Sequence, residues 1–258
     1  MAAGRLISLL ALLFLSISLL LLWFTILSGI TSTSPLRQTY FLRADTSGIT
    51  GARPISQWTY FRICGLDNTD CGPSRPGLPL GDAWATGAAG VPAELIGSYG
   101  NGTTSYQYWY LWRFGWVFYL IALFFMTCAF LGSWLACLGR LGAGLIATVS
   151  SVGLLFLSVA VALMTATFVK TRNAFVADGR SAALGAYGFG FSWGSWATMF
   201  IATVLFCVAR RGHASDGQRT TTMTGNRWSG STFGRRKSSG TAGSRRSWDG
   251  RRVKEEYA

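Results

Sequence analysis

Four apolar segments of about 20 residues or more constrain the fold of this chain. An apolar helix of that length crosses a hydrocarbon core of about 30 Å. The composition agrees, because 50% of the 258 residues are hydrophobic and only 13% are charged. That is about half the charged fraction of a soluble domain. We therefore expect an all-α membrane protein whose fold class is a four-helix transmembrane bundle.

The boundaries of the bundle follow from where the apolar segments begin and end. The expected spans are residues 6–27, 113–136, 142–169 and 188–209. The first span could be a signal peptide. It is, however, about twice as long as the apolar region of a typical signal peptide, and it has Trp23 near its end. We expect an uncleaved helix. The remaining segments are residues 1–5 at the N-terminus, the connections 28–112, 137–141 and 170–187, and the tail 210–258.

The net charge of +13 is concentrated in the tail. Residues 210–258 contain twelve Lys and Arg against four acids. A dense basic block beside spanning helices is retained in the cytoplasm. It meets anionic lipid more often than nucleic acid. With four spans, both termini are then expected to be cytoplasmic, and residues 28–112 and 170–187 to be extracellular.

The tail is rich in Ser, Thr, Gly and Arg and has few aliphatic residues, so we expect it to be disordered. Its Arg-rich motifs would attract anionic lipid by about 1 kcal/mol per basic residue, and phosphorylation would weaken that attraction. The candidates for these roles are Arg235, Arg236, Lys237, Ser238, Arg245, Arg246 and Ser247. The alternative is that the tail acts only as a topology signal.

The connection 28–112 carries the cysteines that matter most for function. Cys64 and Cys71 would close a small loop, which a disulfide stabilises by roughly 2–3 kcal/mol. Two free thiols are the alternative, although an extracellular location favours oxidation. A strand is expected over Gln57–Ile63, with Trp58 against the disulfide. Asn101 begins a glycosylation sequon, which is usable only on the lumenal side.

Outside the connection 28–112, the sequence offers few candidates for a modified, metal-binding or catalytic residue. Cys137 and Cys207 fall near the cytoplasmic ends of their helices and are candidates for palmitoylation, with a packing role as the alternative. His213 has no second ligand at metal-binding spacing, and no catalytic motif is present. The expected spans hold no Asp, Glu or Lys away from their ends, which argues against a transporter. We expect no enzyme activity, no cofactor and no metal.

Several motifs resemble one known group of proteins. They are Ile26-Leu27-Ser28-Gly29, Thr46-Ser47-Gly48-Ile49, Trp58-Thr59-Tyr60-Phe61 leading to Cys64, and Tyr110-Leu111-Trp112-Arg113-Phe114. The most specific lie in the second loop, at Asn173, Phe175 and the segment Arg180–Gly185 with Leu184. On these residues the chain resembles the fungal Sur-seven/PalI family of four-span plasma-membrane proteins, part of the claudin-like group.

The resemblance implies a location in eisosomes, which are furrow-like domains of the plasma membrane. It also implies roles in membrane and sphingolipid organisation, endocytosis and cell-wall integrity. The expected partners are the lipid bilayer, anionic lipids or sphingolipids, further copies of the chain, cortical scaffold proteins and the cell wall. A membrane sensor in pH or stress signalling is the alternative, and a transporter or pore is a third reading. True claudins carry Gly-Leu-Trp before the first Cys, where this chain has Arg62-Ile63, so barrier formation is not implied.

Overall fold

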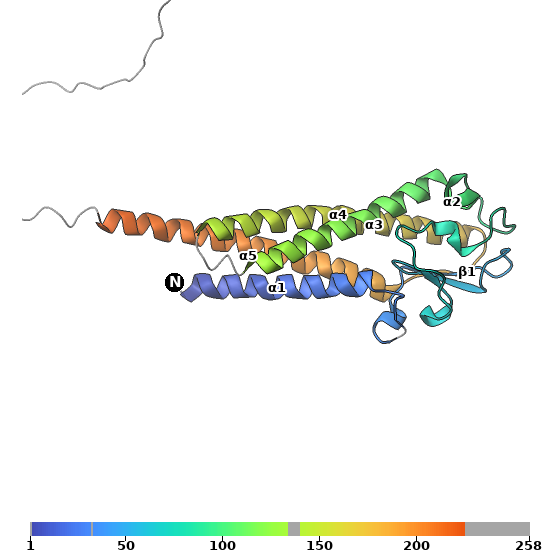
Figure 1. The fold of residues 1–258 in the computed structure, drawn as a ribbon, viewed down its shortest axis with the longest axis horizontal. Coiled ribbons are helices and arrows are strands. Elements are labelled where there is room, and N and C mark those ends of the chain that lie inside the picture. The colour runs from blue at the N-terminus through green and yellow to red at the C-terminus, as the bar shows by residue number, and fades with distance from the viewer. Residues whose placement is uncertain (1, 32, 134–139, 225–258) are drawn as a thin grey trace, which may run out of the picture. The chain divides into compact units, whose positions relative to one another are not determined.

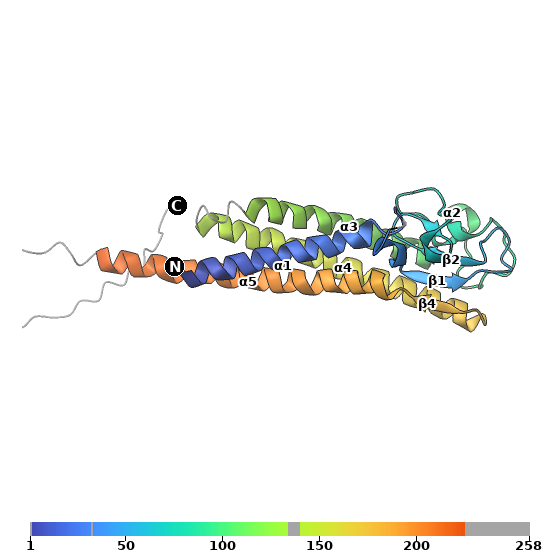
Figure 2. The ribbon, with the colours of Figure 1, turned by 90° about the horizontal axis from the view of Figure 1, so that it is seen from below.

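The computed structural model describes residues 2–31, 33–133 and 140–224. Four of its helices are long and apolar enough to cross a membrane: α1 (Ala2–Ile26), α3 (Tyr106–Gly132), α4 (Arg140–Ala177) and α5 (Ala186–Thr224). They run lengthwise beside one another, and a small sheet lies at one end (Figures 1 and 2). The predicted four-helix transmembrane bundle is confirmed. Met1–Gln218 forms one compact unit and Arg219–Ala258 a second, of which only the end of α5 is described.

The helices extend beyond the apolar segments from which the spans were predicted. α3 begins at Tyr106, before the expected start of its span. α4 continues to Ala177, so that it includes Asn173 and Phe175, which we expected in a loop. α5 runs to Thr224, into the segment expected to be disordered. Backbone hydrogen bonds are satisfied inside a helix whether or not its side chains face lipid, so a helix need not end where its apolar run ends.

Four short strands form an antiparallel sheet in the order β3-β2-β1-β4. They are β1 (Leu42–Asp45), β2 (Ile55–Trp58), β3 (Ile63–Cys64) and β4 (Ala182–Leu184). β4 comes from the connection between α4 and α5, and it pairs with β1, with Ala183 opposite Arg43. The connections 28–112 and 170–187 therefore contribute strands to one sheet.

The single strand predicted over Gln57–Ile63 is wrong. The chain turns at Thr59–Arg62, and Gln57 and Trp58 pair with Cys64 and Ile63 across a hairpin. The Thr59 amide and hydroxyl both donate to the carbonyl of Arg62, at 2.9 and 2.8 Å. This local bonding offers the backbone an alternative to a continuing strand.

Short helices complete the connections. They are η1 (Leu36–Gln38), η2 (Leu66–Asn68), η3 (Leu80–Ala83) and α2 (Tyr99–Gly102). η2 lies between the two cysteines. α2 contains Asn101 in a left-handed conformation, with φ of 60°.

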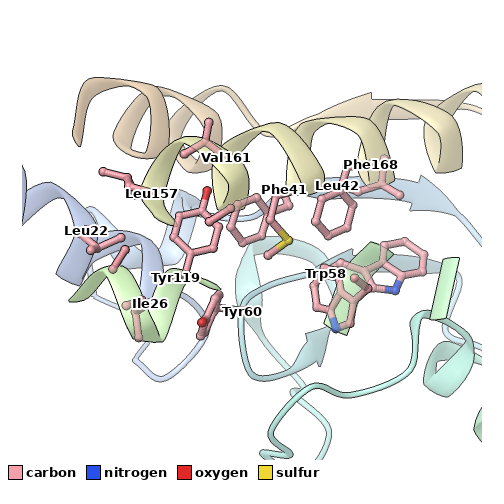
Figure 3. Close-up of a cluster of buried hydrophobic side chains, with 14 of the residues drawn as sticks. Leu22, Ile26, Phe41, Leu42, Trp58, Tyr60, Tyr119, Leu157, Val161 and Phe168 are labelled. Carbon is pink, nitrogen blue, oxygen red and sulfur yellow. The ribbon is translucent and has the colours of Figure 1, made fainter. Parts of the chain in front are cut away.

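An aromatic core joins the sheet to the bundle (Figure 3). Phe41, just before β1, stacks on Phe168 of α4 with ring centroids 5.1 Å apart. Trp112 of α3 meets the same Phe168 edge-on at 4.9 Å. Tyr60, in the β2–β3 turn, donates its hydroxyl to the carbonyl of Trp116 at 2.6 Å. Buried aromatic side chains contribute large apolar areas, so this core fixes the sheet to the helices.

Hydroxyl groups connect the helices inside the bundle. Ser18 of α1 donates to the carbonyl of Ser195 of α5 at 2.6 Å, and Ser195 donates to the carbonyl of Ser18 at 2.9 Å. Trp196 donates its indole N–H to the hydroxyl of Ser158 of α4 at 2.8 Å. Such interhelical bonds stabilise helix packing where water is excluded.

Candidate functional site in the head region

The two connections at the sheet end of the bundle form the strongest candidate for a functional site. We call residues 27–105 and 178–185 the head region. Its two parts are separated by the length of α3 and α4, yet the pairing of β4 with β1 makes them one unit (Figure 2). Its geometry rests on a disulfide, an aromatic contact and an arginine.

Cys64 and Cys71 form a disulfide. Cys64 is buried at the end of β3. η2 fills the loop between the cysteines, and the backbone closes it through bonds from Gly65 to Thr69, at 2.7 Å, and from Gly72 to Ile63, at 2.9 Å. The loop is therefore held by backbone pairing as well as by the covalent link.

Asn68, inside the disulfide loop, joins that loop to the rest of the head region. Its side-chain amide donates to the carbonyls of Leu36 and Thr39 at 2.9 and 3.0 Å. Its backbone amide donates to the side chain of Gln57 at 3.0 Å. Asn68 is buried, so these bonds replace water contacts that its two nitrogens have lost, whereas its side-chain oxygen has no partner among the described residues. The disulfide loop thus positions η1 against β2.

Trp58 does not lie on the disulfide, which corrects the sequence-based expectation. Gln57 is the residue opposite Cys64, and neighbouring residues of a strand point to opposite faces. Trp58 therefore faces away from the disulfide, into the core. Its indole N–H donates to the carbonyl of Leu80 at 3.0 Å, and its ring lies 5.9 Å from that of Phe175.

The side chain of Phe175 connects α4 to the sheet. It is fully buried, and its ring also lies 6.4 Å from the ring of Trp84. This contact explains why α4 continues beyond its apolar segment. A buried Phe supplies contact area that compensates for ordering two further helical turns.

Arg180 bonds three segments with one side chain. Its Nη1 donates to the carbonyl of Ser47 at 2.7 Å and its Nη2 to the carbonyl of Gly90 at 2.8 Å. Its Nε donates to Asp178 at 3.1 Å. The guanidinium is planar and offers several fixed donors, which suits it to bind several acceptors at once. It thereby ties the second connection to two loops of the first.

The other family-like residues that we expected in the second loop, Asn173, Leu184 and Gly185, lie in different environments. The backbone N–H of Gly185 donates to the carbonyl of Phe41 at 3.0 Å. A Cβ added to Gly185 would overlap the carbonyl of Tyr40. Asn173 is exposed and accepts a bond from Arg172 at 3.2 Å. Leu184 is 37% exposed. Gly185 therefore sets how closely β4 approaches β1, whereas Asn173 and Leu184 are accessible from solvent or membrane.

An open cleft of about 400 Å³ lies beside β4 and β1. Its lining includes Arg43, Asp45, Ser47, Ile55 and Ala183. Asp45 accepts bonds from the hydroxyl of Ser47 at 2.6 Å and from its amide at 2.9 Å. These bonds, the hydroxyl's first, lower the pKa of Asp45 below its ordinary value. The carboxylate therefore stays charged well into the acidic range.

The remaining candidate residues are scattered. Asn101 is exposed, and the hydroxyl of Thr103 in its sequon donates to Gly100 at 2.6 Å. Cys207 is a free, exposed thiol that lines a cleft of about 200 Å³ on α4 and α5. Cys137 and the tail candidates Arg235, Arg236, Lys237, Ser238, Arg245, Arg246 and Ser247 lie outside the described residues.

Sequence reasoning missed several residues that build the site. Phe41 and the strand after it were not predicted, although Leu42 and Ala44 alternate with Arg43 and Asp45 in the period-two pattern of a strand. The role of Asn68 had no signal beyond its place between two cysteines. Among the described residues there is no group of three or more His, Cys, Asp or Glu that could hold a metal ion.

Comparisons with known proteins match most of the chain. The model of the SUR7/PalI family matches residues 7–205. Protein SUR7 of Candida albicans is 37% identical over 196 residues, covering 74% of this chain and 70% of that protein. The SUR7 family protein FMP45 of Saccharomyces cerevisiae is 33% identical over 218 residues, covering 77% and 67%.

A further relative from Saccharomyces cerevisiae bears a name that describes it as a plasma membrane protein. It is 30% identical over 192 residues, covering 72% of this chain and 61% of that protein. The alignments therefore span between 61% and 70% of the length of these three relatives. The family match, residues 7–205, includes the whole head region and most of the four long helices.

Proposed function

Because the chain belongs to the SUR7/PalI family, we propose that it is a non-enzymatic organiser of eisosome-type domains in the plasma membrane. In this role it supports membrane and sphingolipid organisation, endocytosis and cell-wall integrity. Both termini would be cytoplasmic and the head region extracellular. The basic tail would bind anionic lipid or a cortical scaffold, and the head region would meet the cell wall or another copy of the chain.

One structural observation carries this proposal beyond the family name. The connections 28–112 and 170–187 are joined into a single head region by β4 and Arg180, and the disulfide braces the first of them. A head region held at this many points presents a fixed surface at the end of a membrane bundle. Fixed surfaces suit lateral assembly and wall contact, because binding then costs little ordering entropy.

The hydroxyl groups of the bundle support an organiser over a transporter. Ser18, Ser195 and Ser158 bond to neighbouring helices, as described above. Thr127, Ser151 and Thr165 each donate to the carbonyl four residues earlier in their own helix. These hydroxyls are engaged in holding and satisfying the helices, which is their commoner use in membranes. Ser150 of α4 is an exception, because its hydroxyl is buried and has no hydrogen-bond partner among the described residues.

Live-cell imaging tests the proposal. The full chain, with a fluorescent tag on its C-terminus, is imaged beside a cortical scaffold marker. Stable patches at the cell edge that coincide with the marker are the expected result. A diffuse plasma-membrane signal, or an endosomal signal, would contradict the organiser role and favour the sensor or transport readings.

A further inference from the structure

The sheet of the head region has one covered edge and one open edge. At the β3 edge, the backbone N–H of Gly72 donates to the carbonyl of Ile63 at 2.9 Å. The N–H of Arg75 donates to the carbonyl of Phe61 at 3.1 Å, so the segment after the disulfide loop closes this side. β4 ends the sheet on the other side, where it lies beside β1 (Figure 2).

The register of the sheet determines which backbone groups of β4 point outward. The N–H of Asp45 donates to the carbonyl of Ser181, its direct partner, at 2.8 Å. Hydrogen-bonded and non-hydrogen-bonded pairs alternate along an antiparallel ladder. Ala182 and Leu184 therefore turn their N–H and C=O groups away from β1, toward the open edge. Within the described residues these four groups have no hydrogen-bond partner.

The side chains of β4 do not protect this edge. The strand reads Ala-Ala-Leu, without the charged residue or proline that commonly keeps an edge from pairing with another chain. Ala183 and Leu184 are exposed. Unpaired backbone groups in alternate positions match the backbone of an extended peptide, which can add to a sheet as a further strand. Since β4 has three residues, such a partner segment need only be short.

The cleft beside β4 supplies a charge for a side chain of the partner. Arg43 lines this cleft from β1, directly opposite Ala183. Within the described residues Arg43 has no ion pair or hydrogen bond, and its guanidinium carbon lies 5.9 Å from the centroid of the Tyr40 ring. Strands are spaced about 4.8 Å apart, so an added strand would lie about 10 Å from β1. An arginine and a glutamate side chain together bridge that gap, and the small side chain of Ala183 leaves the path open.

We propose that the open edge of β4 binds a short extended peptide of another protein, which adds a fifth strand to the sheet and places an acidic side chain against Arg43. Its backbone would pair with the outward groups of Ala182 and Leu184. The partner is acidic because Arg43 is unpaired, whereas Asp45 in the same cleft already accepts two bonds from Ser47. The site depends on the fold of the head region and not on the organiser role, so imaging and peptide binding can fail separately.

Binding of a synthetic peptide to the purified full chain tests this site. The probe is fluorescently labelled Thr-Val-Thr-Glu-Thr-Val-Thr, and its affinity is measured by fluorescence anisotropy in detergent micelles. A second peptide carries N-methyl groups on the two residues that flank the glutamate, which removes the N–H groups that would face β4. It should bind at least about tenfold more weakly, because two backbone hydrogen bonds are lost. A third peptide has glutamine in place of the glutamate.

The variant Ala182→Pro tests the edge from the side of the protein. Proline removes an N–H that points away from β1, and it is tolerated on edge strands in that position. The variant should bind the glutamate peptide about fivefold more weakly. Hydrogen exchange at the amide of Asp45, which bonds to Ser181, should stay slow and so report that β4 still pairs with β1. If the variant does not fold, the N-methylated peptide still decides, because it is tested on the wild-type protein.

The variant Arg43→Gln tests the charge. It should weaken binding of the glutamate peptide about threefold and leave binding of the glutamine peptide unchanged, as expected for an ion pair near the surface. Arg37→Gln is the matched control, because Arg37 is paired with Asp67 at 3.0 Å and does not line the cleft. It should keep wild-type affinity for both peptides.

The other outcomes decide against the proposal. It is overturned if the wild-type protein does not bind the glutamate peptide, or binds the N-methylated peptide equally well. Unchanged affinity of Arg43→Gln for the glutamate peptide would remove the acidic partner. Displacement of the probe by laminarihexaose, a soluble glucan fragment, would assign the cleft to a polysaccharide instead. Dimers of the wild-type chain that Ala182→Pro abolishes would assign the edge to a second copy.

Discussion

Replacing Arg180 by Gln should loosen the contact between the two connections without unfolding the bundle. The two bonds from its guanidinium to the carbonyls of Ser47 and Gly90 are charge-assisted and short, at 2.7 and 2.8 Å. Each bond to a charged group contributes about 1.5–3 kcal/mol when it is buried. The side chain of Arg180 is 18% exposed, and water can reach carbonyls freed at the surface. We therefore expect a loss of about 2 kcal/mol in the local stability of the loops, which is below the sum of the two bonds.

Hydrogen exchange measures this loss directly. The amides of Thr50 and Ala85 bond to the carbonyls of Ala89 and Thr50, at 3.5 and 3.1 Å, and so report whether the two loops hold together. A loss of about 2 kcal/mol raises their exchange rates roughly 30-fold, since 1.4 kcal/mol is a factor of ten. Arg180→Lys, which keeps the charge but loses the planar fork, should fall between Arg180→Gln and wild type.

Arg172→Gln provides the control, because Arg172 is exposed and its side chain bonds, among the described residues, to its neighbour Asn173 alone. It should leave exchange at Thr50 and Ala85 unchanged. The reasoning is refuted if Arg180→Gln exchanges like wild type. It is also refuted if protection falls equally in the hairpin of β2 and β3, which Arg180 does not touch.

Three further predictions concern the core, the bundle and pH. Gly185→Ala should lower cell-surface delivery, because its Cβ overlaps the carbonyl of Tyr40, whereas Gly190→Ala, where the space is open, should not. Ser195→Ala should lower the free energy of unfolding of the purified chain by about 1 kcal/mol, because it removes a hydrogen bond from α5 to α1. An unchanged melting temperature would count against that bond. The pKa of Asp45 is lowered in the fold, so the hydrogen bonds that Asp45 accepts from Ser47 stabilise the turn fully at pH values above the ordinary pKa of aspartate. The bonds are lost as pH falls through the lowered value. Protection of the Ser47 amide, corrected for intrinsic exchange, should decline below about pH 4, and Asp45→Asn should abolish that dependence.

The spans were predictable because their signal is local and dense. An apolar run of about 20 residues in a chain with few charges has one common solution, a membrane helix. The pairing of Cys64 with Cys71 was predictable for a similar reason, since the two lie close in sequence. What the sequence could not provide is the partner of each residue across the fold.

Three residues illustrate this limit. Arg180 binds backbone carbonyls of Ser47 and Gly90, and a carbonyl has no side-chain signature in a sequence. β4 has only three residues, which is too short to show a period-two pattern. Trp58 faces Phe175 and not the disulfide because of its register against β3, and a shift of one residue reverses the face of every side chain.

The connection 28–112 should not fold when it is produced alone. Trp58 would lose the ring of Phe175, β1 would lose β4, and Phe41 would lose the rings of Phe168 and Phe189, which lie 5.1 and 5.7 Å away. These contacts come from α4, α5 and the segment between them. Removing a large buried aromatic contact costs about 3–5 kcal/mol, and a small domain has little stability to spare.

The disulfide cannot compensate for that loss. It closes a loop of a few residues at one edge of the sheet, and a short loop yields only about 2–3 kcal/mol. The isolated segment should therefore show fast hydrogen exchange at Gln57 and Trp58, even with Cys64 and Cys71 oxidised. A protected, cooperatively unfolding fragment would contradict this and would make the head region a domain of its own. The head region instead depends on the bundle for its core, which is why its surface is fixed relative to the membrane helices.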